Sequence, residues 1–438
     1  MTRKGVHGLA SQLKDKLIQQ ALERRLQQAE QNAGQATADD PCRFDRLPGY
    51  QHMQILKSGA EQLGIASPFF RLYEGTAGAT IRIGNRDYLN FASYNYLGFS
   101  GDPRVNAAAK AAIDCSGTSV SASRIVSGER PVHRELEKAL AGIYQVDDAV
   151  VMVSGHATNV TTIGCLFGPG DLILHDELIH NSILQGIQLA GARRLFFPHN
   201  DWATADRLLR EQRHKFERVL IVLEGIYSMD GDYPELPRFV EIKNRHRAFL
   251  MVDEAHSLGV MGATGLGIRQ HFGLQGSDVD IWMGTLSKAL AGCGGYVAGE
   301  KALVELLRYM APGFLYSVGM APPLAAAALA ALDCLQREPE RVEALQARGR
   351  AFLEQARAAG INTGTSTGLA IVPVIIGNSL KAVRLANLLF DQGINVQPIL
   401  YPAVPERSAR LRFFLSSEHT GEQIRETVGT LTRALSTL

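Results

Sequence analysis

The feature that most constrains the fold is a series of short apolar runs separated by segments long enough for helices. Each run is almost continuously apolar, as is typical of strands buried on both faces, rather than alternating with polar residues. The runs cover residues 149–153, 172–174, 195–197, 219–223, 248–252, 279–283 and 296–298. This pattern predicts an α/β fold in which helices cover both faces of a mostly parallel central sheet.

The 438 residues are enough for a large α/β domain and a smaller second domain. Apolar residues repeat with a helical period over residues 9–30, the polar segment 31–41 is typical of a linker, and the alanine-rich segment 321–335 predicts a long buried helix. In the carboxyl-terminal part we expect strands at 369–376 and 411–415 and a helix at 380–392. We therefore expect an N-terminal helix, linker and arm at 1–85, a large domain at 86–325 and a small carboxyl-terminal α+β domain at 326–438.

Composition argues against several classes of partner. The 45 basic and 44 acidic residues give a net charge of +1, so no field of one sign favours nucleic acid or an anionic membrane. The five scattered cysteines form no C-x-x-C pair, which indicates neither a zinc site nor a disulfide framework and suits a reducing cytoplasm. The first residues lack an apolar signal segment, and no apolar run reaches the roughly 20 residues that span a bilayer. We expect a cytoplasmic protein with no bound metal, membrane span or nucleic-acid partner.

Lys288 is the most informative single residue. It ends the run Gly284-Thr-Leu-Ser-Lys288, directly after the apolar segment 279–283. A lysine at a buried strand end is desolvated, which lowers its pKa and frees the amine to attack a carbonyl. The hydroxyl groups of Thr285 and Ser287 are placed to hold a phosphate beside it. A Schiff-base lysine next to a phosphate cradle suggests pyridoxal phosphate as cofactor.

Polar residues also follow the other apolar runs, where ligands of such sheets bind. Asp253 and His256 follow 248–252, and a buried carboxylate there needs a cationic partner such as a protonated pyridine nitrogen. The letters D-E-A-H also spell a helicase box, but that box needs an upstream phosphate loop with a Gly-Lys pair, which the chain lacks. Gly155 and His156 open a helix after 149–153, where backbone N–H groups bind anions.

Nine motifs in this order resemble the α-oxoamine synthases. This family of pyridoxal-phosphate enzymes includes 8-amino-7-oxononanoate synthase, 2-amino-3-ketobutyrate ligase, serine palmitoyltransferase and 5-aminolevulinate synthase. The resemblance runs from about residue 60 to the end. Its motifs are Ser93-Tyr-Asn-Tyr-Leu-Gly98, Gly117-Thr-Ser119, Val126-Ser-Gly128 with His133, Ser154-Gly-His156, Asp176 to His180, Ser228-Met-Asp-Gly231, Asp253-Glu-Ala-His256, Gly284-Thr-Leu-Ser-Lys288 and Leu411-Arg412.

The resemblance implies a fold-type I pyridoxal-phosphate transferase that forms a homodimer with active sites at the subunit interface. It implies that Lys288 forms the Schiff base with the cofactor, that His180 stacks on the pyridine ring and that Asp253 pairs with the ring nitrogen. His256 and Ser228 are implied to contact the phenolic oxygen. We expect Lys288, His180, Asp253 and His256 to be the catalytic set.

The resemblance also implies how the phosphate is held. Backbone at Gly155 and His156 binds it together with Thr285, and we add Ser287 from the same run as Lys288. Ser317 matches a position that in relatives reaches the phosphate of the neighbouring subunit.

Three residues are implied to face the amino-acid substrate. Arg412 matches the arginine that grips its carboxylate, which suits the two parallel hydrogen bonds of a guanidinium; Arg410 is the weaker candidate. Ser123, in Ser121-Ala-Ser-Arg124, lies where relatives contact the small substrate, and we assign Asn95 of the first motif to the same substrate. The small hydroxyl at Ser123 does not separate glycine, alanine and serine as substrates.

The implied reaction is the decarboxylative condensation of glycine, alanine or serine with an acyl thioester to give an α-amino ketone. We expect the acyl donor to be acyl-CoA or an acyl carrier protein. The carrier protein is suggested because the helix and polar linker before the family core resemble connectors to carrier proteins. The alternative interpretation of this segment is an ordinary docking helix. Two other readings stay open. One is a different fold-type I enzyme such as an aminotransferase, and the other is a non-catalytic partner subunit.

Overall fold

The computed structural model describes residues 42–62, 64–401 and 403–438. The chain forms two compact units, which meet in sequence between Phe70 and Arg71. The described part of the first unit contains a short 3-10 helix, η1 (Phe44–Arg46), and the helix α2 (Pro48–Gln62). The helix predicted at 9–30 and the linker predicted at 31–41 lie outside the described residues.

A seven-stranded sheet forms the centre of this unit, and each of the seven apolar runs contributes one strand. The strands are β3 (Asp148–Met152), β4 (Leu172–Asp176), β5 (Arg193–Phe197), β6 (Val219–Glu224), β7 (Phe249–Asp253), β8 (Ile281–Thr285) and β9 (Gly295–Gly299). Their order is β3-β9-β8-β7-β6-β4-β5, and β9 alone among them runs antiparallel to its neighbours. The predicted α/β fold with a mostly parallel sheet is confirmed.

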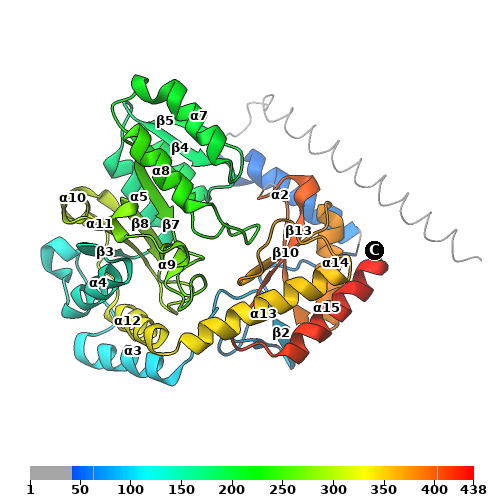
Figure 1. The fold of residues 1–438 in the computed structure, drawn as a ribbon. Coiled ribbons are helices and arrows are strands. Elements are labelled where there is room, and N and C mark those ends of the chain that lie inside the picture. The colour runs from blue at the N-terminus through cyan, green and yellow to red at the C-terminus, as the bar shows by residue number, and fades with distance from the viewer. Residues whose placement is uncertain (1–41, 63, 402) are drawn as a thin grey trace, which may run out of the picture. The chain divides into compact units, whose positions relative to one another are not determined.

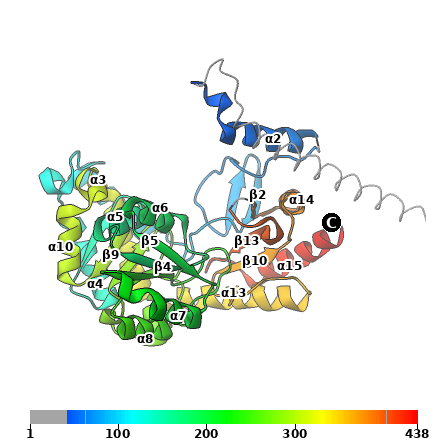
Figure 2. The same ribbon diagram turned by 90° about the horizontal axis from the view of Figure 1, so that it is seen from above.

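Helices cover both faces of the sheet. Figure 2 shows α5 (Gly155–Leu166) and α6 (Asn181–Ala190) on one side of β4 and β5, with α7 (Trp202–Gln212) and α8 (Leu236–His246) on the other. Successive strand residues point to opposite faces. Accordingly, Leu220 and Val222 join the apolar core under α5 and α6, while Val219 and Ile221 join the core under α7 and α8. Burial on both faces explains why the runs are continuously apolar.

The remaining elements flank this sheet or form a second α/β layer. Before and beside the sheet lie α3 (Pro103–Ser116), η2 (Arg124–Gly128), α4 (Pro131–Tyr144), α9 (Gly267–Phe272), α10 (Lys301–Met310) and α11 (Pro312–Leu315). The helix predicted at 321–335 forms α12 (Pro322–Arg337), which packs on α3 and α4. Figure 1 shows α13 (Pro339–Ala358) leading from α12 to the carboxyl-terminal elements.

A smaller antiparallel sheet occupies the carboxyl-terminal part. It consists of β10 (Ile371–Ile375), β13 (Arg410–Phe414) and β12 (Gln397–Ile399), and its companion helices are α14 (Ser379–Asp391) and α15 (Gly421–Ser436). A third sheet joins β1 (Thr80–Ile83), β2 (Arg86–Asn90) and β11 (Ile394–Asn395). The two strands and the helix predicted here are confirmed. None of the helices in the described ranges combines the length and apolarity needed to cross a bilayer.

A buried ion triad connects the large sheet to the segment before β10. His199 lies between two carboxylates, with Nδ1 2.9 Å from Asp176 Oδ1 and Nε2 3.0 Å from Asp232 Oδ2. The Thr365 hydroxyl donates a second hydrogen bond to Asp232. Burial opposes protonation of His199, but the two carboxylates outweigh it and raise the pKa of the imidazole to about 10.

This raised pKa predicts how stability depends on pH. The folded protein holds the His199 proton more tightly than the unfolded chain, whose pKa is about 6.5. Below a pH of about 6.5, the triad therefore makes its full contribution to the free energy of unfolding. This contribution is lost as the pH rises through about 10. We expect His199→Gln to lower the free energy of unfolding by on the order of 3 kcal/mol more at pH 6.5 than at pH 10. Urea unfolding of both proteins measures this; a pH-independent difference would contradict it.

Candidate active site

Lys288 lies just beyond the carboxyl end of β8, where chemistry is expected in a sheet of this kind. Its Nζ is 5.5 Å from the centre of the Tyr94 ring. Burial lowers the pKa of the amine to about 8, and the negative charge of Asp253 opposes this shift. An appreciable fraction of Lys288 is therefore an uncharged nucleophile near neutral pH.

Asp253 is the last residue of β7 and is almost fully buried. Its Oδ1 accepts the Ala255 N–H at 2.9 Å, and its Oδ2 accepts the amide of Asn159 at 2.8 Å. Within the described chain, no lysine, arginine or histidine forms an ion pair with it. A buried carboxylate with only neutral donors favours a cation beside it. A protonated pyridine nitrogen supplies that cation, so the residue fits the predicted cofactor.

His180 is the N-cap of α6 and has an exposed ring. The His156 ring lies 6.4 Å away with an edge-on orientation. Partial burial lowers the pKa of His180, although Asp253 opposes this shift. The other nearby histidine, His175, is buried within β4 and its Nδ1 lies 2.6 Å from the Asp176 carbonyl oxygen. Of the two, only His180 offers an open ring face for stacking.

His256 and Ser228 are both buried at this edge. The Nδ1 of His256 is 2.8 Å from the hydroxyl of Tyr96, which leaves Nε2 for another partner. Burial, with Lys288 and Arg412 adding to it, holds the pKa of His256 well below its usual value, so the ring is neutral. Ser228 accepts a hydrogen bond from Arg412 Nη1 through its backbone carbonyl at 3.0 Å.

The N-terminus of α5 meets the segment after β8. A Cβ added at Gly155 would lie 2.8 Å from Thr285 Oγ1 and 3.0 Å from Thr285 Cβ, so only glycine permits this approach. The hydroxyl of Thr285 donates to the Gly294 carbonyl at 2.9 Å, and the Ser287 hydroxyl accepts the Gly294 N–H at 3.2 Å. The amides of Gly155 and His156 thus stand beside two hydroxyl groups at a helix N-terminus, which suits a phosphate.

The two arginines of β13 differ in whether a carboxylate already neutralises them. Because they are two residues apart, both point to the same face. Arg410 is committed to an ion pair with Asp230 at 2.6 Å. Arg412 has no carboxylate partner in the described ranges; its Nη2 lies 3.4 Å from the Tyr94 hydroxyl and its buried Nε has no partner. A buried guanidinium with unused donors is suited to a substrate carboxylate.

Three other predicted residues are not gathered into this cluster. The side chain of Asn95 donates to the Ala77 carbonyl at 3.0 Å and accepts the Ser100 N–H at 3.0 Å, so it holds its own loop. Ser123 precedes η2 and Ser317 follows α11, and both are half-buried. In the described chain, none of the three has a hydrogen bond to Lys288, Asp253 or His180.

Sequence reasoning missed Tyr94 and Glu224. Tyr94 lies next to the predicted Asn95, and its ring faces Lys288. Glu224 ends β6 and lies opposite Asp253 in the strand register, so its position at a strand end was the available signal. It is buried, and its Oε1 has no hydrogen-bond partner among the described residues. Burial, reinforced by Asp253, raises the pKa of Glu224 well above its usual value, which favours the protonated carboxyl.

The protonated state of Glu224 leads to a specific expectation. Glu224→Gln replaces one neutral group with another of the same shape, so cofactor content and kcat should stay within about threefold of the wild type. Glu224→Ala, which leaves a cavity, should lower the free energy of unfolding by about 2 kcal/mol. Cofactor absorbance, kcat and urea unfolding measure these effects. A tenfold loss of kcat in Glu224→Gln would show that an ionised carboxylate is required.

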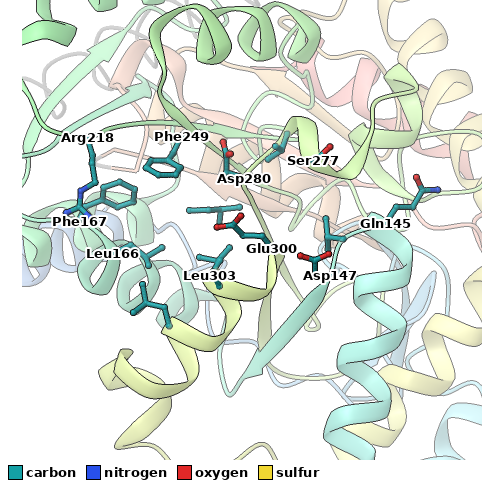
Figure 3. Close-up of a pocket in the computed structure, with 15 residues that line it drawn as sticks. Gln145, Asp147, Leu166, Phe167, Arg218, Phe249, Ser277, Asp280, Glu300 and Leu303 are labelled. Carbon is teal, nitrogen blue, oxygen red and sulfur yellow. The ribbon is translucent and has the colours of Figure 1, made fainter.

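A separate pocket lies at the opposite edge of the sheet (Figure 3). Its volume is about 400 Å³, and its walls include Phe167, Phe249, Ile281 and Leu303. Phe249 and Ile281 begin β7 and β8, whereas Asp253 and Lys288 lie at or beyond the other ends of these strands. The pocket is therefore not part of the site around Lys288.

Comparisons with known proteins agree with this geometry. A family model described as aminotransferase class I and II matches residues 86–431. An 8-amino-7-oxononanoate synthase from Symbiobacterium thermophilum is 39% identical over 84% of this chain and 93% of its own length. A serine palmitoyltransferase from Bacteroides thetaiotaomicron is 36% identical over 85% of this chain and 93% of its own. The structure of a serine palmitoyltransferase from S. paucimobilis with a bound PLP-myriocin aldimine has a TM-score of 0.85 at 29% identity, covering 89% of this chain and 98% of that one.

The fold and the site define a fold-type I transferase that uses pyridoxal phosphate. Within this class, the chain belongs to the α-oxoamine synthases. It is an acyltransferase that condenses an amino acid with an acyl thioester. The family, fold class, cofactor and reaction predicted from the sequence are thus confirmed.

Proposed function

We propose that the enzyme condenses glycine, alanine or serine with an acyl thioester at the site around Lys288 and releases carbon dioxide, a thiol and an α-amino ketone. The observation that supports this site most directly is Arg412, a buried guanidinium with an unused donor and no carboxylate partner in the described ranges. Its Nη2 lies 3.4 Å from the hydroxyl of Tyr94, and the centre of that ring lies 5.5 Å from Lys288 Nζ, which supports a role beside Lys288. Arg412 would bind the amino-acid carboxylate.

The surrounding residues fit pyridoxal phosphate. Lys288 would bind it covalently, Asp253 would hold a proton on the pyridine nitrogen, and His180 would stack on the ring. His256 and Ser228 would donate hydrogen bonds to the phenolic oxygen. The phosphate would be bound by backbone at Gly155 and His156 with the hydroxyls of Thr285 and Ser287. When bound, the cofactor supplies an electron sink for the electron pair released at the amino-acid α-carbon.

The chain's own residues would then manage protons and charge. Arg412 orients the substrate so that its Cα–H bond faces the Lys288 amine, which accepts the proton as a general base. An N–H of His180 would donate to the acyl oxygen as negative charge develops there. Asn95 and Ser123 would contact the small substrate near its α-carbon, as the family pattern implies.

Thiol release tests this function and its substrate range. Glycine, alanine and serine should each be combined with acyl-CoA of increasing chain length and then with carrier-bound acyl groups. We expect release of thiol and carbon dioxide only when both substrates are present. Exchange of the amino group with a 2-oxo acid and no thiol release would identify an aminotransferase instead, and no reaction in any arm would favour a non-catalytic subunit.

A second copy of the chain is proposed as partner, with a residue shared between the sites. The segment 316–319 lies beside the segment 122–128, because Gly319 N–H donates to the Ala122 carbonyl at 2.9 Å. The two segments expose the apolar side chains Ile125, Val126, Tyr316 and Val318. Exposed apolar patches of this kind mark interfaces. Ser317 lies among them and would reach the partner's phosphate.

The dimer has a direct test. Light scattering of the holoenzyme should give twice the mass of one chain, and Tyr316→Glu should shift the protein toward the monomer because it places a charge in the apolar contact. Val318→Thr, a milder change at the same patch, serves as the control for folding. A wild-type protein that stays monomeric at micromolar concentration would exclude the shared site.

The domain division, location and carrier partner complete the proposal. The seven-stranded sheet lies within 86–325 and the sheet of β10, β13 and β12 within 326–438, which supports these two domains after an amino-terminal part at 1–85. We assign the enzyme to the cytoplasm.

Removing residues 1–41 tests whether the amino-terminal segment docks a carrier protein. If it does, the truncation should lower kcat/KM for a carrier-bound acyl group and leave kcat/KM for acyl-CoA unchanged.

A further inference from the structure

A buried hydrogen-bond chain connects Asp253 to His180 through two residues that the mechanism above does not use. The amide nitrogen of Asn159 lies 2.8 Å from Asp253 Oδ2 and 2.9 Å from Ser182 Oγ. Ser182 Oγ in turn lies 2.7 Å from His180 Nδ1. Asn159 and Ser182 are almost fully buried, so water does not compete for these hydrogen bonds.

The direction of every hydrogen bond in this chain follows from its two ends. The Asp253 carboxylate only accepts, so the Asn159 amide must point its NH₂ group toward it. That group has two hydrogens, one for Asp253 and one for Ser182 Oγ. Because the Ser182 hydroxyl accepts from Asn159, its own proton is available for the acceptor at Nδ1 of His180. The backbone N–H of Ser182 also points at this nitrogen, at 3.3 Å.

Two donors directed at Nδ1 are compatible only with an unprotonated nitrogen there. A neutral histidine then carries its proton on the other ring nitrogen. We propose that Asn159 and Ser182 are positioning residues that hold neutral His180 as the Nε2–H tautomer, so that its ring presents an N–H donor to the substrate. The tautomer is a property of the protein itself; its use in the reaction rests on the function proposed above.

The surroundings of His180 agree with a neutral ring. The charged and titratable groups that act on it are Asp253, Lys288, His156 and Arg412. Burial lowers the pKa of the imidazole, Asp253 opposes the shift, and the other three add to it. In the opposite tautomer, Nδ1–H would face both the Ser182 N–H and its hydroxyl, and the hydroxyl proton would lack an acceptor among the described residues.

Nitrogen NMR of holoenzyme containing ¹⁵N-labelled histidine tests the tautomer directly, with His180→Gln to assign the signals. We expect Nδ1 to resonate as an unprotonated nitrogen and Nε2 as a protonated one. Ser182→Ala and Asn159→Ala should each give a mixture of tautomers. Thr162→Val, on the same helix as Asn159, is the matched control and should leave the wild-type pattern unchanged, because the buried Thr162 hydroxyl has no hydrogen-bond partner in the described part of the chain.

Kinetics provide a second readout. Ser182→Ala should lower kcat by about three- to tenfold with little change in KM for the amino acid, because only part of the enzyme then carries the donor. Loss of the hydroxyl hydrogen bond to the neutral ring should also raise the pKa of His180 and move the acid limb of the kcat profile to higher pH. A merely structural role for Ser182 would not move this limb.

Two results would overturn the inference. One is a protonated Nδ1 in the wild-type holoenzyme, and the other is an unchanged Nε2–H tautomer in both folded variants, Ser182→Ala and Asn159→Ala. Neither result depends on which substrates the enzyme accepts. If thiol release failed with every substrate pair while the NMR pattern was as expected, the proposed function would be wrong and the positioning of His180 would stand.

Discussion

Lys288→Ala is expected to lower kcat by about 10³-fold or more, because the variant lacks both the covalent anchor of the cofactor and the general base at the α-carbon. The position of the Lys288 amine supports an effect of this size. It lies at the carboxyl edge of the sheet, and burial lowers its pKa to about 8.

Borohydride reduction checks the same residue without measuring activity. Reduction of the wild-type holoenzyme should fix the cofactor permanently to the peptide that contains Lys288, and Lys288→Ala should release it on denaturation. Lys301→Ala is the matched control, because that side chain is exposed and its ion pair with Glu305 is a surface pair of little energetic weight. Cofactor fixed to any other lysine would disprove the assignment.

Arg412→Ala should raise KM for the amino acid by about 30- to 1000-fold, as expected when one partner of a buried charged hydrogen-bonded pair is removed. Cofactor content should stay unchanged, because Arg412 contacts the Ser228 backbone and Tyr94 rather than the phosphate cradle. Arg412→Lys should restore binding only in part, since an ammonium group cannot form two parallel hydrogen bonds to a carboxylate. Steady-state kinetics and cofactor absorbance measure both effects.

Two comparisons make this expectation specific. Arg407→Ala changes an exposed arginine in the same part of the chain and should leave KM unchanged. Amines that lack the carboxylate should bind wild type and Arg412→Ala equally weakly. Loss of the cofactor spectrum in Arg412→Ala would mean that the residue supports the cofactor or the fold instead of the substrate.

Much of the fold could be predicted from local sequence. Each of the seven apolar runs forms a strand because residues buried on both faces of a sheet must be apolar at successive positions. The order of these strands could not be read in the same way. β9 lies between β3 and β8 and runs antiparallel to both, and that arrangement depends on pairing between segments far apart in the chain.

In the candidate site, too, some residues could be predicted from local sequence and others depend on long-range contacts. Lys288 and Asp253 could be predicted because each follows an apolar run, and the carboxyl ends of parallel strands meet at one edge. Glu224 meets the same criterion but was passed over, and its raised pKa comes from burial and from Asp253 on the neighbouring strand. Asn95 matches its motif, but its side-chain amide forms hydrogen bonds with the backbone of Ala77 and Ser100. The motif alone does not reveal these hydrogen bonds.

The sequence by itself determined the strands, the lysine and the family, because these depend on the type and spacing of neighbouring residues. Only the tertiary structure decided which of two similar side chains is available. Arg410 is neutralised by Asp230, 180 residues away in the chain, whereas Arg412 keeps unused donors. His175 is buried in a strand while His180 is open, and the Asn159–Ser182 connection orients the His180 ring. The physical reason is that hydrogen bonding and burial are set by residues that meet only when the chain folds.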